Sequence, residues 1–137
     1  RATSATLPPP SPTHIPAPFF LFPPTQGPVP HVEIGKGPVI SYAPAVQNNL
    51  RERIIETAEK KKIPFQRLAS SRFTGTDTDA FAYSNGGVPS ALISLPLRYM
   101  HTTVETVHKD DVENVIRLIF ESVQTIKNGE TFSYFDA

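Results

Sequence analysis

The chain has 137 residues, and its 13 basic side chains balance its 13 acidic side chains. A neutral chain has no field of one sign, so we expect no nucleic-acid partner and no attraction to an anionic membrane. Its apolar runs are far shorter than the ~20 residues of a membrane-spanning helix. It also has no cysteine for disulfides, thiolate nucleophiles or cysteine-based metal sites. This composition favours a single cytoplasmic domain.

Prolines divide the chain, because ten of the fifteen lie in the first 30 residues. Each proline removes a backbone donor and fixes φ, so residues 1–32 are predicted to be a disordered segment rich in polyproline II. Within it, Phe19-Phe20-Leu21-Phe22 lies between Pro18 and Pro23. These four apolar residues either pack on the folded domain or form a ligand for an aromatic-lined groove of another protein.

Residues 33–137 are predicted to form the folded domain. Residues 38–42 favour a strand that follows the Gly35-Lys36-Gly37 turn. A helix is expected to start near Pro44, because Val46, Leu50, Ile54 and Ala58 recur at four-residue steps and form one apolar stripe. Three lysines at 60–62 end it, where the helix dipole favours positive charge.

A second strand is predicted at residues 63–69, a short helix at 80–83 and a nearly continuous apolar strand at 90–97. Such a strand is typical of a parallel sheet covered on both faces. Apolar residues from Val112 to Ile126 recur at three and four positions and predict a last long helix with acidic residues in its first turn. The order predicts an α/β fold in which helices pack on a mostly parallel sheet, and one face of each long helix lacks a complete partner surface.

Two segments could carry chemistry. His101 comes just after the predicted strand 90–97, and ligands of open α/β sheets bind at the carboxyl ends of strands. Its imidazole could bind a metal or act as a base, while Glu105 could orient the ring or face solvent. In the 75–79 loop, Asp77 and Asp79 could bind a metal or cap the helix that follows.

Several motifs in this region occur together and in order. They are Gly75-Thr76-Asp77, Gly87-Val88-Pro89 before the apolar strand, Arg98-Tyr99-Met100-His101, and Glu105 shortly after it. Across about residues 33–127, the chain closely resembles the C-terminal part of the dinuclear-metal aminopeptidases of the TET, glutamyl and deblocking group, some of which have been labelled endoglucanases. Residues 1–32 do not share the resemblance.

The resemblance implies part of a three-layer αβα zinc-peptidase-like domain. It implies that His101 binds one of two divalent metal ions, zinc or cobalt, which in the family share a bridging water that attacks the peptide bond. Gly75, Thr76, Asp77, Arg98 and Glu105 would then belong to the site loop or support the ligand. The implied substrate is a peptide with a free N-terminus, and the implied enzyme is a large homo-oligomer.

The chain departs from the family pattern upstream. The family's remaining metal ligands and its catalytic glutamate precede the matched region, whereas residues 1–32 contain no aspartate or glutamate. We therefore expect no catalytic residue in this chain, one metal ligand, and no activity of the chain on its own. The alternative is a non-catalytic α/β module that binds a peptide or a partner subunit.

Overall fold

A small mixed sheet forms the centre of the fold. The structure, a computed structural model, describes residues 32–132, so the predictions for the proline-rich segment lie outside the described residues except at Val32. Strand β1 (Val39–Tyr42) lies between β2 (Gln66–Ala69) and β3 (Ile93–Ser94). It pairs in parallel with β2 and antiparallel with β3. The α/β class is confirmed, and the sheet of these residues is mixed.

The predicted strand at residues 90–97 is wrong as a single element. The structure divides it into β3 and a separate strand β4 (Leu97–Arg98), which pairs antiparallel with β5 (Thr106–Val107) in a second sheet. The buried Pro96 stands between β3 and β4 and has no N–H to continue a ladder. A continuous apolar run therefore supplies two short strands to two different sheets.

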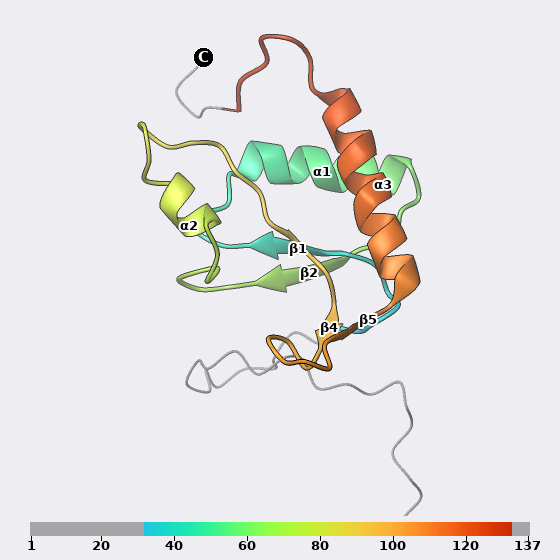
Figure 1. The fold of residues 1–137 in the computed structure, drawn as a ribbon. Coiled ribbons are helices and arrows are strands. Elements are labelled where there is room, and N and C mark those ends of the chain that lie inside the picture. The colour runs from blue at the N-terminus through green and yellow to red at the C-terminus, as the bar shows by residue number, and fades with distance from the viewer. Residues whose placement is uncertain (1–31, 133–137) are drawn as a thin grey trace, which may run out of the picture.

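Three helices complete the described fold. Helix α1 (Asn48–Lys60) begins later than predicted, because the side chain of Gln47 caps it by accepting a hydrogen bond from the backbone N–H of Leu50. Helix α2 (Thr78–Phe81) is a single turn that begins two residues before the predicted position. Helix α3 (Lys109–Thr125) crosses α1 (Figure 1) and matches the predicted last helix. None of these helices has the length and apolar character needed to cross a membrane.

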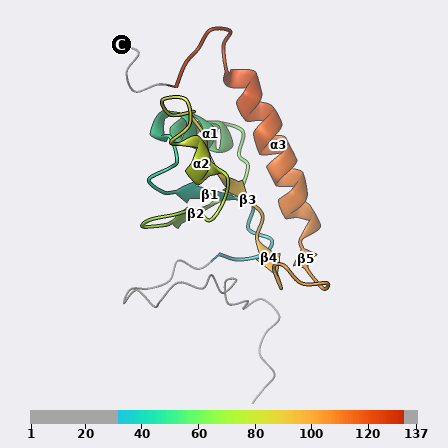
Figure 2. The same cartoon turned by 60° about the vertical axis from the view of Figure 1, so that its left-hand side comes forward.

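The core lies where α1 meets β1 and α3. It consists of buried aliphatic side chains from all three elements and from the turn after α1, namely Ile40, Ile54, Ile55, Ala58, Ile63 and Leu118. The predicted stripe of α1 supplies two of them, Ile54 and Ala58, so the four-residue spacing identified its buried face correctly. Figure 2 shows the β4–β5 hairpin outside this core, next to the start of α3.

Candidate functional site

His101 lies in the β4–β5 hairpin. Leu97 pairs with Val107 and Arg98 with Thr106, so residues 99–105 form the connecting loop. Figures 1 and 2 both place this hairpin at the end of the molecule where α3 begins. His101 therefore follows a strand of the hairpin, and not, as expected, the carboxyl end of a strand in the central sheet.

The backbone of this loop is held in an unfavourable conformation by its own side chains. His101 has a φ of 62° and Tyr99 a φ of 54°, in the left-handed region that residues other than glycine rarely adopt. The Glu105 carboxylate accepts a hydrogen bond from the His101 backbone N–H at 2.9 Å, and the Thr102 hydroxyl donates one to the Tyr99 carbonyl at 2.6 Å. Glu105 is exposed, as in the second alternative considered for it, and its carboxylate also fixes the backbone of His101.

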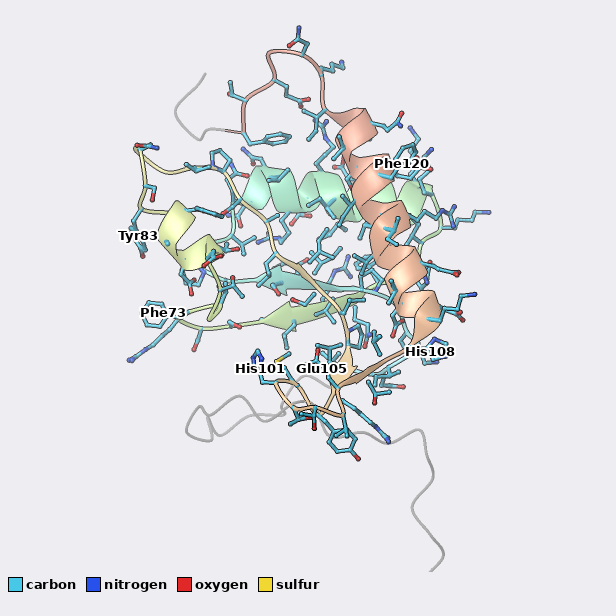
Figure 3. The ribbon with its side chains drawn as sticks, in the orientation of Figure 1. Phe73, Tyr83, His101, Glu105, His108 and Phe120 are labelled. Atoms are coloured by element: carbon cyan, nitrogen blue, oxygen red, sulfur yellow. The ribbon has the colours of Figure 1, made fainter. Side chains whose placement is uncertain are left out.

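The imidazole of His101 is exposed at the surface, and Figure 3 shows it on the same loop as Glu105. An exposed neutral ring can offer a nitrogen to a metal ion. However, residues 32–132 contain no cluster of three or more histidine, aspartate or glutamate side chains that could hold a metal. The donors present in this part of the chain therefore do not fit a complete two-metal centre.

The second predicted segment forms a compact loop before α2. The Asp79 carboxylate accepts hydrogen bonds from the backbone N–H groups of Thr74 and Gly75, each at 3.0 Å. The Thr74 and Thr76 hydroxyls are 2.8 Å apart and hydrogen-bonded. The Thr74 N–H, more than any other group, holds the pKa of Asp79 below its ordinary value.

Helix capping is the wrong interpretation for these two aspartates. Asp77 occupies the position before α2, but its side chain forms no capping hydrogen bond and is exposed. Asp79 lies in the first turn of α2 and binds backward to the loop. Its carboxylate shapes the Gly75-Thr76-Asp77 turn, and the exposed Asp77 carboxylate is the one that remains available to a ligand.

The predicted site residues thus fall into two groups. Arg98, His101 and Glu105 lie on the hairpin, while the 75–77 turn lies on the loop between β2 and α2. His101, Glu105 and the 75–77 turn are exposed, so both groups are surface features of the described residues.

Sequence reasoning missed one residue that positions the hairpin. Asp111, in the first turn of α3, is fully buried and accepts hydrogen bonds from the N–H groups of Gly35 at 2.7 Å and Gly37 at 2.8 Å. It fixes the start of α3, which directly follows β5. A signal was present, because Asp111 precedes the buried Leu118 by seven residues and so lies on the same face of the helix.

Comparisons with known proteins agree on one family. A family model described as M42 glutamyl aminopeptidase matches residues 24–118. The lysyl aminopeptidase of Pyrococcus furiosus is 40% identical over 95 residues, which are 69% of this chain and 28% of that protein. The chain therefore spans little more than a quarter of that relative.

Solved structures give the same result. The TET aminopeptidase from the marine sediment archaeon Thaumarchaeota archaeon SCGC AB-539-E09 has a TM-score of 0.61 and 29% identity, over 69% of this chain and 27% of that chain. PhTET1-12s, a dodecamer in its crystal, has a TM-score of 0.59 and 31% identity, over 72% of this chain and 30% of that chain. The hairpin and the 74–79 loop both lie inside the stretch that the family model matches.

Proposed function

The chain belongs to the M42 glutamyl aminopeptidase family, and from this premise we propose that it is the C-terminal part of a metal-dependent aminopeptidase. The complete enzyme releases N-terminal residues from peptides that have a free amino terminus. The observation that carries the proposal is the conformation of His101, whose left-handed backbone is fixed by Glu105 inside the matched stretch. Strained residues held by their surroundings are concentrated at functional sites.

In this proposal His101 is the ligand that the chain contributes to the metal centre. Glu105 holds the ligand's backbone, Arg98 belongs to the strand that leads into the loop, and the Gly75-Thr76-Asp77 turn borders the site. The two metal ions, zinc or cobalt, need further ligands and a general base, and those come from parts of the enzyme upstream of the matched region. We therefore assign no step of peptide hydrolysis to residues of this chain, and the isolated chain is inactive.

The proposal extends to the complete domain and its assembly. The parallel pairing of β1 with β2 supports a larger, mostly parallel sheet between two helical layers, with the antiparallel β3 as a local exception. The dodecameric arrangement of PhTET1-12s supports a homo-oligomer. The lack of cysteine favours the cytoplasm.

A chimera tests the proposal directly. The segment of the Pyrococcus furiosus lysyl aminopeptidase that aligns with this chain is replaced by the corresponding 95 residues of this chain. The chimera is expected to bind metal and to hydrolyse a lysyl chromogenic substrate. Its His101→Ala variant is expected to lose at least about 100-fold in kcat/KM, since removing a ligand costs at least as much as removing an outer partner.

The matched control is His108→Ala, which removes an exposed imidazole seven residues away at the start of α3. It should leave kcat/KM within about threefold of the chimera if its cap has only the usual ~1 kcal/mol effect on stability. A chimera that folds and binds metal but has no activity would contradict the family function of this segment. Full activity of the His101→Ala chimera would contradict the assignment of the ligand alone.

A second candidate function is a non-catalytic module that binds a peptide or a partner subunit. The exposed apolar side of α3 favours it. Metal analysis of the purified chain helps to separate the two functions: two tightly bound zinc or cobalt ions per chain would contradict the expected inactivity, and would also contradict the non-catalytic module.

A further inference from the structure

One side of α3 is apolar, and no residue from 32 to 132 covers it. Its exposed side chains are Ile116, Ile119, Phe120, Val123 and Ile126, which we call the α3 apolar face. More than half of the surface of three of these residues is exposed: Ile116 is 63%, Phe120 60% and Val123 61% exposed. Figure 3 labels Phe120 on this helix.

The α3 apolar face is not the face that builds the core. Leu118 and Ser122, which lie on the other side of the helix, are 0% and 6% exposed. The residues of the α3 apolar face recur at steps of three and four and therefore form one continuous stripe. Contiguous apolar patches of this kind on a water-soluble surface mark sites of contact.

We propose that Phe19-Phe20-Leu21-Phe22 of the same chain docks on the α3 apolar face. This tetrapeptide is the one run of four large apolar residues in the first 31 residues, and prolines border it on both sides. Residues 1–32 contain no acidic side chain to be desolvated on docking. The tetrapeptide also lies outside residues 24–118, so the contact is a property of this chain and not of its family.

The connection between the two segments is long enough. Asp111 holds Gly35 at the first turn of α3, so the described chain starts beside that turn. Thirteen residues lead from Phe22 to Gly35, and an extended chain of that length spans up to about 43 Å. The α3 apolar face lies between about 8 and 22 Å along the helix from Asp111. A tether of this length gives the tetrapeptide an effective local concentration near the millimolar range.

A single introduced thiol tests the contact, because the chain has no cysteine of its own. The Val123→Cys variant is prepared with the natural tail and with a second tail in which Phe19, Phe20, Leu21 and Phe22 are all serine. Labelling of Cys by a maleimide is expected to be about tenfold slower with the natural tail, which corresponds to a docked-to-free ratio of about ten. The two tails differ only at residues 19–22, outside the residues that the structure describes, and matching circular dichroism spectra check that both proteins fold alike.

Two controls make the result decisive. Glu56→Cys places a thiol at an exposed position of α1 and should react at the same rate with either tail. The slow labelling of Val123→Cys must also be independent of protein concentration, as an intramolecular contact requires.

Other results would overturn the proposal. Equal and fast labelling with both tails would show an open face, free for another polypeptide such as the remainder of an M42 catalytic domain. Protection that disappears on dilution, with a doubled mass in sedimentation, would show a second copy of the chain as the occupant. Neither measurement uses metal or substrate, so the result is independent of the proposed enzymatic function.

Discussion

Asp111 is the residue on which the position of the hairpin depends. Its buried carboxylate binds two backbone N–H groups of the 35–37 turn, and it lies at the N-terminus of α3, where the helix dipole also favours negative charge. Removal of this carboxylate leaves both donors without it, and the buried N–H of Gly37 in particular then costs free energy as an unsatisfied donor. The start of α3 and the β5 strand before it are therefore anchored to the other end of the described chain.

We predict that Asp111→Asn lowers the free energy of unfolding by about 2 kcal/mol, because the amide can accept only one of the two hydrogen bonds and directs an N–H group at the other donor. Urea denaturation followed by circular dichroism measures the change.

Asp110→Asn is the matched control for this prediction. It is the same substitution one residue earlier, at a side chain that is 70% exposed, and it should change the free energy of unfolding by less than about 0.5 kcal/mol. Equal effects of the two substitutions would mean that the loss of helix-dipole charge, and not the buried hydrogen bonds, explains the stability.

At the scale of the elements, the pairing of β1 with β2 depends on a close approach at its entry. Gly37 precedes β1 with a φ of 91°, and a Cβ atom there would overlap the backbone carbonyl of Pro64, just before β2. The carbonyl of Pro38 then accepts a hydrogen bond from Gln66 at 2.8 Å as the parallel ladder begins. Only glycine fits the position, because both its conformation and the space around it exclude a side chain.

We predict that Gly37→Ala destabilises the chain by about 3 kcal/mol, of which about 1–2 kcal/mol is the cost of the left-handed conformation. The rest comes from the steric overlap with Pro64. Thermal unfolding of the purified variant measures the loss.

Gly75→Ala separates the two causes. Gly75 has a φ of 72° but no atom within 4 Å of the added Cβ, so it should lose only the conformational part, about 1–2 kcal/mol. If both variants lost the same stability, the close approach to Pro64 would be unimportant.

The elements that were predicted correctly are those with a local signal. The apolar spacing along α1 identified its buried face, including Ile54 and Ala58, because helix periodicity repeats in consecutive turns. Along α3 the same reasoning was wrong about the buried face, since most of the stripe between Val112 and Ile126 is exposed and the helix buries Leu118 instead. The pairing of β3 with β1 depends on contacts between residues more than 50 positions apart, which no local pattern contains, whereas β4 pairs with the nearby β5 after the break at Pro96. The candidate site shows the same limit. The sequence identified His101 and Glu105 as candidate residues, but it did not predict the hydrogen bond from the His101 backbone N–H to the Glu105 carboxylate.

On the scale of the whole molecule, carboxylates tie the ends of the described chain to its helices. After α3, Glu130 accepts a hydrogen bond from the Lys127 N–H at 2.9 Å and forms an ion pair with Arg53 of α1 at 2.6 Å. The Lys127 N–H, followed by Arg53, lowers the pKa of Glu130 from its ordinary value. The pKa of Asp79 is also lowered, and its carboxylate binds the loop before α2 to the first turn of that helix.

These pKa shifts fix the direction of the pH dependence. A carboxyl group whose pKa is lower in the folded state binds protons more weakly there than in the unfolded chain. Its contribution to stability is therefore complete above the ordinary pKa, 4.5 for Glu130 and 3.8 for Asp79, and is lost as the pH falls through the lowered values. We predict that the melting temperature is constant from pH 7 to about 5 and falls below about pH 4.5.

Glu130→Gln tests this prediction at one group. The variant should melt at a lower temperature than the natural chain at pH 7, and the difference should shrink toward pH 3, where the natural Glu130 is protonated as well. Glu113→Gln, at an exposed residue that pairs only with the exposed Lys109, should follow the natural chain at every pH. Melting curves of the three proteins between pH 3 and pH 7 measure these differences in melting temperature. If the difference between Glu130→Gln and the natural chain stayed constant over this range, the stabilising contact of Glu130 with α1 would not depend on its ionisation, and the prediction would be contradicted.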